Sequence, residues 1–339
     1  MARKSERRKS DRRKSDARST RGSRDTARAG KSVAKAAPAA AAHPPAPAKI
    51  KFRGKLLENE PLARYTTWRL GGPARYLALP ADTEDVVRAL ELAHDRGLPW
   101  VVLGLGSNVL VKDGGFPGVV IRMGKGLDRF EMKGATAIVG AGMPTPILAR
   151  RTAEAGFAGV ERFLGIPGSV GGGIYMNAGC HGAEFSEVVT EVTVMDQKGK
   201  VKQLSRKQIS FKYRSTNLEG IVLEAKLVLG EESPAKLKEL QSKLLRWRKA
   251  GTPFDQPCCG STFTNPQGGT KTAGMLIDEC GLKGFQLGGA QVSTLHANYI
   301  INKGTATASD VLKVIEHVRK TVAKKTGVTL ELECKIIGN

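Results

Sequence analysis

The sequence predicts an α+β protein with a glycine-rich middle. From residue 75 onward, short apolar stretches typical of strands occur together with longer stretches that have helical periodicity. Residues 165–182 interrupt this pattern, because glycine is frequent there and no strand or helix period is present. A doubly wound parallel sheet would need strands and helices to alternate without such a break, so the sequence favours an α+β fold.

The first expected elements are a strand at 74–80 and a helix at 82–98. In this helix Asp82 is a candidate N-cap residue, acidic residues fill the first turn, and apolar residues recur at helical spacing. Further strands are expected at 100–104, 119–123, 136–142, 187–196, 220–229, 298–302 and 329–337. Further helices are expected at 144–156, 233–249, 272–282 and 309–325, and Gly156 and Gly327 stand where the first and last of these should end.

Basic charge is concentrated at the N-terminus of this 339-residue chain. Residues 1–50 hold 15 Lys and Arg against 4 Asp and Glu, a formal charge of +11, which is half of the total of +22. Because apolar residues other than alanine are nearly absent there, we expect residues 1–48 to be a disordered, basic, Ala/Pro-rich extension. Such an arm can contact nucleic acid or another anionic surface, or it can be a solvated tail outside the chemistry, and we favour the tail. The uneven distribution excludes a uniformly basic protein such as a histone.

The chain carries no sign of export or of membrane insertion. It lacks an apolar run of about 18 residues, so no membrane span is expected. Its N-terminus lacks the apolar segment of a secretory signal. Five cysteines without a C-x-x-C pair argue against a disulfide framework or a metal site and favour a reducing cytoplasm.

Glycine-rich loops suggest a large cofactor. The segment 104–111, GLGSNVLV, resembles the G-x-G-x-x-G motif of dinucleotide-binding Rossmann folds, but Val109 occupies the third glycine position and no helix pattern follows. We therefore reject that fold. The loop still suits backbone N–H contacts to phosphate oxygens, although an inter-strand turn is an equal alternative for this segment alone. A second loop at 165–172 and GAG at 140–142 indicate one cofactor that spans two subdomains.

Several motifs, taken together and in this order, resemble the UDP-N-acetylenolpyruvoylglucosamine reductase family. The resemblance runs from about Leu62 to Gly338. It is carried by TTWRLGGPA (66–74), LGLGSNVLVKDGGFPGVVI (103–121), GIPGSVGGGIYMNAG (165–179), FKYRS (211–215), CGSTFTNP (259–266), AGMLIDECGLKGFQLGGAQVSTLHANYIIN (273–302) and GVTLELECKIIG (327–338). No insertion separates Leu229 from the helix expected at 233–249, so the chain resembles the shorter subtype, which lacks a loop carrying a substrate-closing tyrosine.

The resemblance implies the FAD-binding fold of the vanillyl-alcohol-oxidase/PCMH type with an added substrate-binding domain. The implied parts are a first FAD-binding subdomain at 49–125 with the closing strand 329–339, a second at 126–230, and a C-terminal α+β substrate-binding domain at 231–328. FAD would be held non-covalently. The implied cofactor-binding residues are Gly104, Leu105, Gly106, Ser107, Asn108, Gly140, Gly142, Gly165, Ile166, Pro167, Gly168, Ser169, Gly171, Gly172 and Asn177.

The implied reaction is the reduction of UDP-N-acetylglucosamine enolpyruvate to UDP-N-acetylmuramate. In the family, NADPH reduces FAD, the flavin N5 delivers hydride to the enol ether, and a proton is added at the neighbouring carbon. Such a site needs a general acid near the substrate and cations around its carboxylate. The product is a peptidoglycan precursor, so the implied role lies in cell-wall biogenesis, cell shape and cell division. We expect a monomer in the bacterial cytoplasm.

Three residues match the catalytic positions of the family. Ser261 in CGSTFTNP matches the proton donor, and Arg214 in FKYRS matches the arginine that stabilises the developing carboxylate charge. Glu331 and Glu333 would face the same side of a strand, so spacing alone does not choose between them, and the resemblance selects Glu333. Tyr213, Asn265 and His296 match positions near the substrate.

Two rival functions remain open at this stage. One is an oxidase of the same fold class with covalently attached flavin, because Cys180 and His181 lie in the glycine-rich stretch. Release of yellow FAD on acid precipitation would exclude covalent attachment. The other is a nucleic-acid-binding protein, suggested by the basic arm and a pI near 10.0. Aromatic residues are only 5% of the chain, and no basic motif rich in aromatic residues supports that function.

Overall fold

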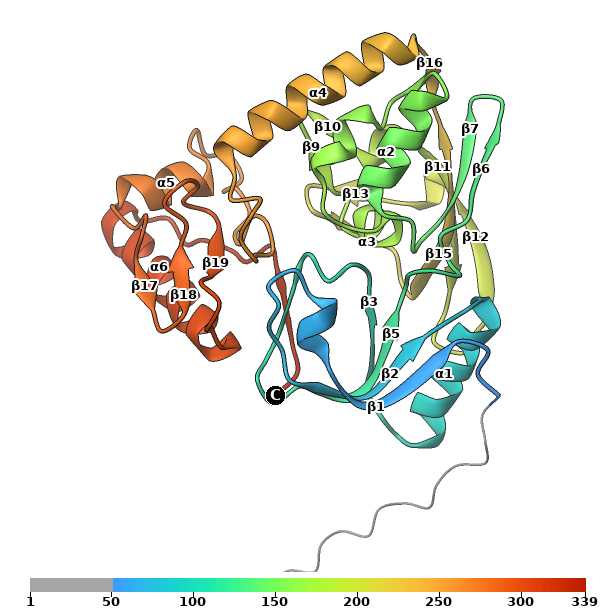
Figure 1. The fold of residues 1–339 in the computed structure, drawn as a ribbon, viewed down its shortest axis with the longest axis horizontal. Helices are drawn as coiled ribbons and strands as arrows, with labels where there is room; N and C mark the ends of the chain where they lie inside the picture. The colour runs from blue at the N-terminus through green and yellow to red at the C-terminus, as the bar shows by residue number, and fades with distance from the viewer. Residues whose placement is uncertain (1–50) are drawn as a thin grey trace, which may run out of the picture. The chain divides into compact units, whose positions relative to one another are not determined.

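Two large sheets and a smaller C-terminal layer of helices and strands carry the structure (Figure 1). The computed structural model describes residues 51–339, which belong to one unit that spans residues 49–339. The predicted arm at 1–48 lies outside the described residues. Helices and strands are both abundant, and a mixed sheet stands beside an antiparallel one, which confirms the predicted α+β class.

The first sheet combines parallel and antiparallel strands. Its strand order is β1 (Lys55–Pro61), β2 (Pro73–Leu79), β5 (Phe116–Arg122) and β3 (Trp100–Leu103). Strand β1 runs antiparallel to β2, whereas β2, β5 and β3 are parallel to one another. Helix α1 (Thr83–Asp95) connects β2 with β3. The Asp82 side chain accepts a hydrogen bond from the backbone N–H of Asp85, which confirms the predicted cap.

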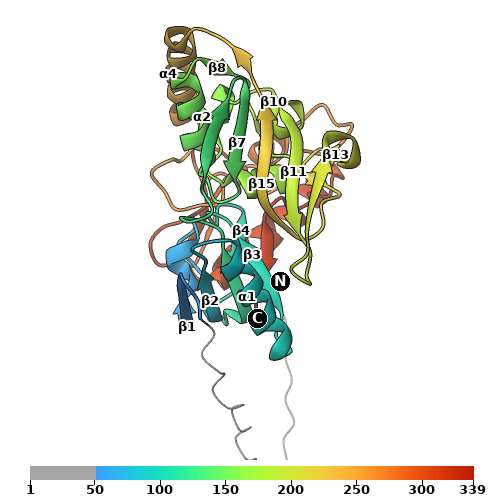
Figure 2. The ribbon, with the colours of Figure 1, turned by 90° about the vertical axis from the view of Figure 1, so that its right-hand side faces the viewer.

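The second sheet is entirely antiparallel. Its order is β12 (Val201–Ser205), β11 (Val189–Met195), β15 (Ile221–Val228), β7 (Thr136–Gly140) and β6 (Phe130–Lys133). Figure 2 shows the long strands of this sheet running upright, with α2 (Thr145–Glu154) beside them. Helix α3 (Val170–Tyr175) packs against β7 and β15, so the second glycine-rich loop is anchored to this sheet.

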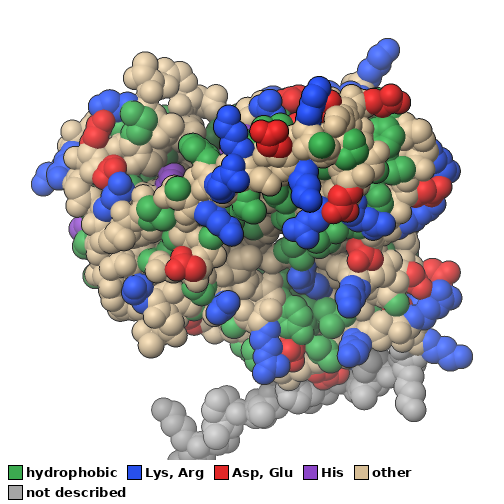
Figure 3. Space-filling view, turned by 45° about the horizontal axis from the view of Figure 1, so that its top comes forward, with side chains coloured by type: hydrophobic (Ala, Val, Ile, Leu, Met, Phe, Trp, Pro, Cys, Tyr) green, Lys and Arg blue, Asp and Glu red, His purple; other side chains and the backbone are tan. Residues whose placement is uncertain are grey.

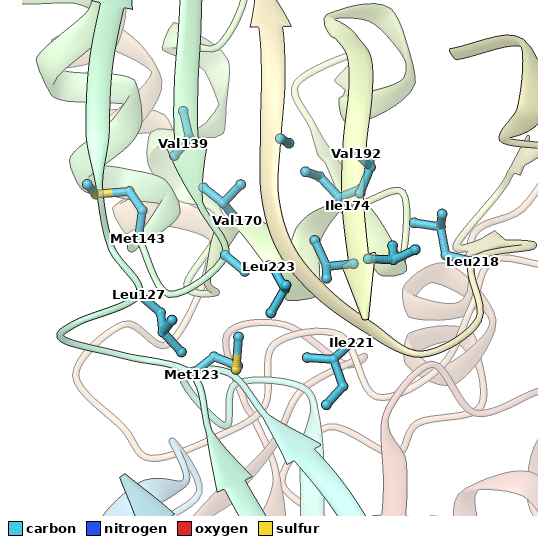
Figure 4. Packing of buried hydrophobic residues seen from close by; sticks show 14 of the residues in the cluster. Met123, Leu127, Val139, Met143, Val170, Ile174, Val192, Leu218, Ile221 and Leu223 are labelled. Atoms are coloured by element: carbon cyan, nitrogen blue, oxygen red, sulfur yellow. The ribbon is translucent and has the colours of Figure 1, made fainter. Parts of the chain in front are cut away.

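The two sheets share one hydrophobic core. In Figure 4, Met123 and Leu127, from the segment that leaves β5, lie close to Leu223 of β15. On the other side of the same core, Ile174 of α3 lies beside Val192 of β11. Close packing of side chains from both sheets fixes the sheets relative to each other, and it thereby fixes the loops between them.

The C-terminal layer has a core of its own. Helix α4 (Pro234–Gly251) leads into it from the second sheet. The layer consists of α5 (Ala273–Glu279), the three-stranded sheet β17 (Gln286–Leu287), β18 (Ala290–Val292) and β19 (Ile300–Asn302), and α6 (Ala308–Thr326). As predicted, α6 ends at Gly327, which has a left-handed φ of 75°. Within residues 51–339, no helix combines the length and apolar composition needed to cross a membrane.

Short strand pairs complete the fold. They are β4 (Val109–Val111) with β20 (Lys335–Ile337), β8 (Phe157–Ala158) with β16 (Gly230–Glu231), β9 (Gly179–Cys180) with β10 (Ala183–Glu184), and β13 (Phe211–Lys212) with β14 (Ser215–Thr216). The parallel pairing of β20 with β4 returns the C-terminus to the segment that follows the first glycine-rich loop.

The closing strand is shorter than predicted. Of the expected range 329–337, only β20 is a strand. Before β20, Leu332 forms an isolated bridge with Phe263, and the Glu333 N–H donates to the carbonyl oxygen of Thr262. Leu330, Leu332, Cys334 and Ile336 all pack in the core of the C-terminal layer, whereas Ile337 packs against the core of the first sheet. The alternating apolar residues before β20 thus face one core without belonging to a longer strand, and the sequence pattern does not distinguish this arrangement from one long strand.

The glycine-rich stretch 165–182 contains a helix that the sequence did not predict. Helix α3 includes three consecutive glycines, which normally disfavour a helix. Packing overrides this preference, because a Cβ on Gly171 would lie 2.7 Å from Cβ of Ala141. A Cβ on Gly173 would lie 2.4 Å from the ring of Phe185. Only glycine lets the helix approach its neighbours this closely.

Candidate active site

A cavity of about 1150 Å³ lies among the glycine-rich loops, the end of α4 and the segments around residues 259–261 and 333–337. Its volume exceeds that of a site for one drug-sized ligand, which suits a large cofactor together with a substrate. The molecular face shown in Figure 3 is hollowed near its centre, and Lys and Arg side chains gather around the hollow. A surface of this charge attracts anionic ligands.

Most of the predicted cofactor-binding residues line this cavity. They are Gly104, Leu105, Gly106, Ser107, Asn108, Ile166, Pro167, Gly168, Ser169, Gly171 and Gly172. The two loops lie against each other, because a Cβ on Gly104 would be 2.4 Å from Oγ of Ser169. Gly106 has φ +67°, and a Cβ there would lie 2.1 Å from the backbone oxygen of Tyr65. A larger residue at position 104 would therefore fill the space between the loops, and one at position 106 would clash with the backbone at Tyr65.

The donors in these loops suit a phosphate-bearing ligand such as FAD. None of the backbone N–H groups of 104–108 donates a hydrogen bond to another group of residues 51–339. The Ser169 hydroxyl is buried and also has no partner there. Buried polar groups are rarely left unpaired, so a ligand is expected to complete these hydrogen bonds. The residues present therefore fit the FAD that the sequence predicts.

Four predicted cofactor-binding residues do not line the cavity, namely Gly140, Gly142, Gly165 and Asn177. A Cβ on Gly140 would lie 2.3 Å from the carbonyl oxygen of Leu127, and a Cβ on Gly142 would lie 2.4 Å from that of Gly124. These two glycines thus allow close packing of the backbone beside the site.

Asn177 is fully buried and has a positive φ of 43°. Its Nδ2 donates to the Lys212 carbonyl oxygen at 3.1 Å, and its Oδ1 accepts from the Ser186 N–H at 3.0 Å. These bonds hold β13 and the turn at Ser186 to the segment that follows α3, so Asn177 supports the strand that leads to Arg214 and does not line the cavity.

Arg214 and Glu333, which are far apart in the sequence, form an ion pair at the cavity. Nε of Arg214 donates to Oε1 of Glu333 at 3.1 Å, and the two side chains are 21% and 17% exposed. Nη2 of Arg214 also donates to the Gly179 carbonyl oxygen at 3.3 Å. Burial raises the pKa of the Glu333 carboxyl above its usual range, against the opposing effect of Arg214.

The structure distinguishes Glu333 from Glu331. Glu331 is exposed, and its backbone oxygen accepts a hydrogen bond from the Thr264 N–H. Glu333 lines the cavity and carries the ion pair to Arg214. Both residues precede β20 and lie outside a regular strand, and of the two only Glu333 reaches the cavity.

Ser261 also lines the cavity, together with Arg214 and Glu333. It follows Gly260, which has a positive φ of 81°, and it precedes the buried Thr262. The Thr262 N–H donates to the Asn298 carbonyl oxygen at 2.8 Å, so the turn that carries Ser261 is fixed to the C-terminal layer. Ser261 itself is half-buried.

Of the three residues predicted to lie near the substrate, one lines the cavity and two are exposed outside its lining. His296 lines the cavity, and burial lowers the pKa of its imidazole. Its Nδ1 accepts a hydrogen bond from the Asn298 N–H at 3.2 Å. Tyr213 and Asn265 are exposed and do not line the cavity. They contact each other, since the Asn265 N–H donates to the Tyr213 hydroxyl at 3.3 Å.

The sequence analysis did not identify Arg248 and Tyr299, which both line the cavity. An arginine in the last turn of a charged helix such as α4 is usually a surface residue, so its sequence context carries no functional signal. Tyr299 lies beside the predicted His296 but is buried, and burial raises the pKa of its hydroxyl. Cys180 and His181, named for the rival covalent flavoprotein, line the same cavity.

Comparison with known proteins gives matches that cover most of the chain. Residues 252–337 match a family model described as UDP-N-acetylenolpyruvoylglucosamine reductase, C-terminal domain, and residues 74–205 match an FAD binding domain. Relatives named UDP-N-acetylenolpyruvoylglucosamine reductase from Halalkalibacterium halodurans and Bacillus subtilis are 42% identical over 288 residues and 40% identical over 289 residues. Both matches cover 84% of this chain and 95% of the relative.

A solved structure agrees with these matches. The crystal structure of UDP-N-acetylenolpyruvylglucosamine reductase from Thermus caldophilus has a TM-score of 0.72 and 36% sequence identity. The match covers 84% of this chain and 99% of that chain. Together with the FAD-binding family model, it confirms the predicted fold class.

Proposed function

This chain belongs to the UDP-N-acetylenolpyruvoylglucosamine reductase family, and on that premise we propose that it uses NADPH to reduce UDP-N-acetylglucosamine enolpyruvate to UDP-N-acetylmuramate. It is an oxidoreductase with an FAD-binding domain, and its family makes a peptidoglycan precursor. The observation that carries the proposal is the meeting of Arg214, Ser261 and Glu333, from three distant segments, at one cavity.

We propose that the loops at 104–108 and 166–172 hold FAD, whose N5 supplies the hydride when the cofactor is bound. The unpaired N–H groups of the first loop and the Ser169 hydroxyl are suited to its phosphate oxygens. Binding is non-covalent in this proposal. Burial raises the pKa of the Cys180 thiol, so Cys180 lacks the thiolate character that a nucleophile needs.

Arg214 is proposed to bind the enolpyruvyl carboxylate of the substrate. Negative charge grows on this group when the neighbouring double bond accepts hydride. A guanidinium presents two parallel N–H groups to a planar carboxylate, and it would bind the charged intermediate more tightly than the substrate. Its contacts to Glu333 and to the Gly179 carbonyl hold the guanidinium in place before substrate binds.

Glu333 is proposed to position Arg214 and to donate a hydrogen bond to the intermediate. An ionised carboxylate beside an enolate would repel it. The raised pKa of Glu333 favours the protonated form, which can donate instead. Proton uptake by Glu333 would also free the charge of Arg214 for the substrate carboxylate.

Ser261 is proposed to give the proton that completes the lactyl ether. The added proton and the hydride together saturate the former double bond. Serine is a weak acid in water, so its action needs a water-poor setting and a hydrogen-bonded substrate. Its place in the lining of the same cavity as the ion pair of Arg214 and Glu333 supports this role. His296, Tyr213 and Asn265 are proposed to contact the substrate at the rim.

The proposal is tested by measuring NADPH consumption with UDP-N-acetylglucosamine enolpyruvate in the wild type and in Ser261→Ala. We expect the variant to keep its yellow flavin and its reduction by NADPH, while turnover falls on the order of 10²–10⁴-fold through loss of the general acid. Acid precipitation of the same preparations should release FAD into solution, as non-covalent binding requires.

Normal turnover in Ser261→Ala would remove the serine from the mechanism. A wild type that binds FAD but shows no turnover with the enolpyruvyl compound would overturn the proposed function. Flavin that stays with the precipitated protein would revive the covalent alternative through Cys180 or His181.

A further inference from the structure

Arg248 is a cation of the cavity whose charge has no carboxylate partner among residues 51–339. It stands in the last turn of α4. Its Nη1 donates to Sγ of Cys180 at 2.9 Å, and its Nη2 donates to the Tyr299 hydroxyl at 3.4 Å. Its Nε is buried and makes no hydrogen bond. A guanidinium that is partly withdrawn from water is costly unless an anion compensates its charge.

The groups around Arg248 are neutral at ordinary pH. Burial raises the pKa of the Cys180 thiol and of the Tyr299 hydroxyl, so neither carries a negative charge. Burial lowers the pKa of His181 and of His296, so neither imidazole is a cation that would compete for an anion. Among residues 51–339, the protein therefore orients Arg248 but provides no counter-charge for it.

The fold also makes room for this side chain. A Cβ on Gly165 would lie 2.7 Å from Cδ and 3.1 Å from Nε of Arg248. Gly165 was predicted to bind the cofactor, yet it does not line the cavity. Its lack of a side chain instead allows Arg248 to reach Cys180 and Tyr299. The ring of Phe254 lies 5.7 Å from the guanidinium carbon.

We propose that Arg248 is a substrate-binding residue that holds an anionic oxygen group of the UDP-sugar, an inference that rests on the proposed function above. Two groups of that substrate have the required chemistry, its diphosphate and its enolpyruvyl carboxylate. Arg214 and Arg248 contact the adjacent residues Gly179 and Cys180, so both cations serve neighbouring parts of one ligand. Since Arg214 is assigned to the carboxylate, we assign the diphosphate to Arg248.

The test measures equilibrium binding to the oxidised, FAD-loaded enzyme by calorimetry. Two ligands separate the two anionic groups, because UDP-N-acetylglucosamine has the diphosphate but lacks the carboxylate. Arg248→Gln removes the charge at nearly the same length. Arg246→Gln is the matched control, since Arg246 is exposed on the same helix and does not line the cavity. Gly165→Ala keeps every charge but pushes Arg248 from its place.

We expect Arg248→Gln to weaken binding of both ligands about 10- to 100-fold, the range for a lost charged hydrogen bond. Gly165→Ala should weaken binding in the same direction, and Arg246→Gln should bind like the wild type. If binding were weakened only for the enolpyruvyl ligand, Arg248 would still be an anion-binding residue. The group that it binds would then be the carboxylate, and the assignment to the diphosphate would be wrong. Unchanged binding of both ligands in Arg248→Gln and in Gly165→Ala would overturn the inference.

The flavin spectrum and the unfolding temperature report whether a variant is folded and loaded. If Arg248→Gln does not retain its flavin, the ligand binding measured for Gly165→Ala tests the inference by itself. Failure of the inference is distinct from failure of the proposed function. If only the inference about Arg248 fails, the wild type turns over the enolpyruvyl substrate and the variants bind it as well as the wild type does. If the proposed function fails, the wild type binds neither ligand, and the inference fails with it.

Discussion

The two arginines of the cavity differ in what the protein provides for them. Arg214 has a carboxylate partner in Glu333, whereas the guanidinium of Arg248 donates hydrogen bonds only to a thiol and a hydroxyl among residues 51–339. A cation that already has a counter-charge can respond to a change in that charge during a reaction. A cation without one is poised for a ligand that brings its own charge. We call the side of the cavity that carries Arg214 and Glu333 the reacting wall, and the side that carries Arg248 and Tyr299 the binding wall.

The backbone supports the same distinction. Arg214 occupies the turn between β13 and β14 with a left-handed φ of 54°, a conformation that non-glycine residues seldom adopt. Such strain is commonly retained at functional positions, where surrounding contacts fix it. Arg248 lies in a regular helix, and only its side chain is specially placed.

The largest expected effect comes from Arg214→Gln on the reacting wall. It removes the cation that we propose stabilises the developing carboxylate charge, so kcat should fall about 10²- to 10³-fold. By contrast, Arg248→Gln should chiefly raise KM. Steady-state kinetics at saturating NADPH measure this split. If Arg214→Gln kept the wild-type kcat and only raised KM, the distinction between the reacting wall and the binding wall would be wrong.

A smaller effect is expected from Glu333→Gln on the pH dependence of stability. The pKa of Glu333 is raised in the folded state, so the folded protein binds this proton more tightly than the unfolded chain does. The stabilising contribution is complete below the unfolded-state pKa of about 4.3 and is lost as the pH rises through the folded-state value. Glutamine cannot ionise and removes this dependence.

The unfolding temperature of Glu333→Gln, relative to the wild type, should therefore increase as the pH rises from about 4 toward neutrality. Thermal unfolding at several pH values measures it. Glu331→Gln serves as the control, because that neighbour is exposed and outside the cavity, and its difference from the wild type should change little. A difference that falls with pH in Glu333→Gln would show that the ion pair to Arg214 outweighs burial.

The smallest effect is expected from Tyr299→Phe on the binding wall. The variant removes a hydroxyl that accepts a long hydrogen bond of 3.4 Å from Arg248 but leaves the guanidinium charge in place. Binding of UDP-N-acetylglucosamine should weaken only about 2- to 5-fold, because the lost hydrogen bond is long and the cation that binds the ligand remains. Calorimetry on the loaded enzyme checks this value. A loss as large as that of Arg248→Gln would mean that the tyrosine itself contacts the ligand.

Much of the local structure could be predicted from the sequence because its causes are local. The cap at Asp82 and the end of α6 at Gly327 depend on residues within one helical turn. The two glycine-rich loops that line the cavity could be located because glycine there marks close approach of the backbone. The closing segment was predicted less well, since the apolar alternation of 329–337 does not reveal that only Lys335–Ile337 pairs as a strand.

The sequence by itself determined the α+β class, most helices and strands and the two glycine-rich loops, and its resemblance to a known family made Arg214, Ser261 and Glu333 candidates. Only the tertiary structure decided which glutamate meets Arg214, which glycines face the cavity and that Arg248 belongs to it. The reason is physical. Helix caps and turns arise between near neighbours, whereas the counter-charge and burial of a side chain depend on segments that only folding brings together.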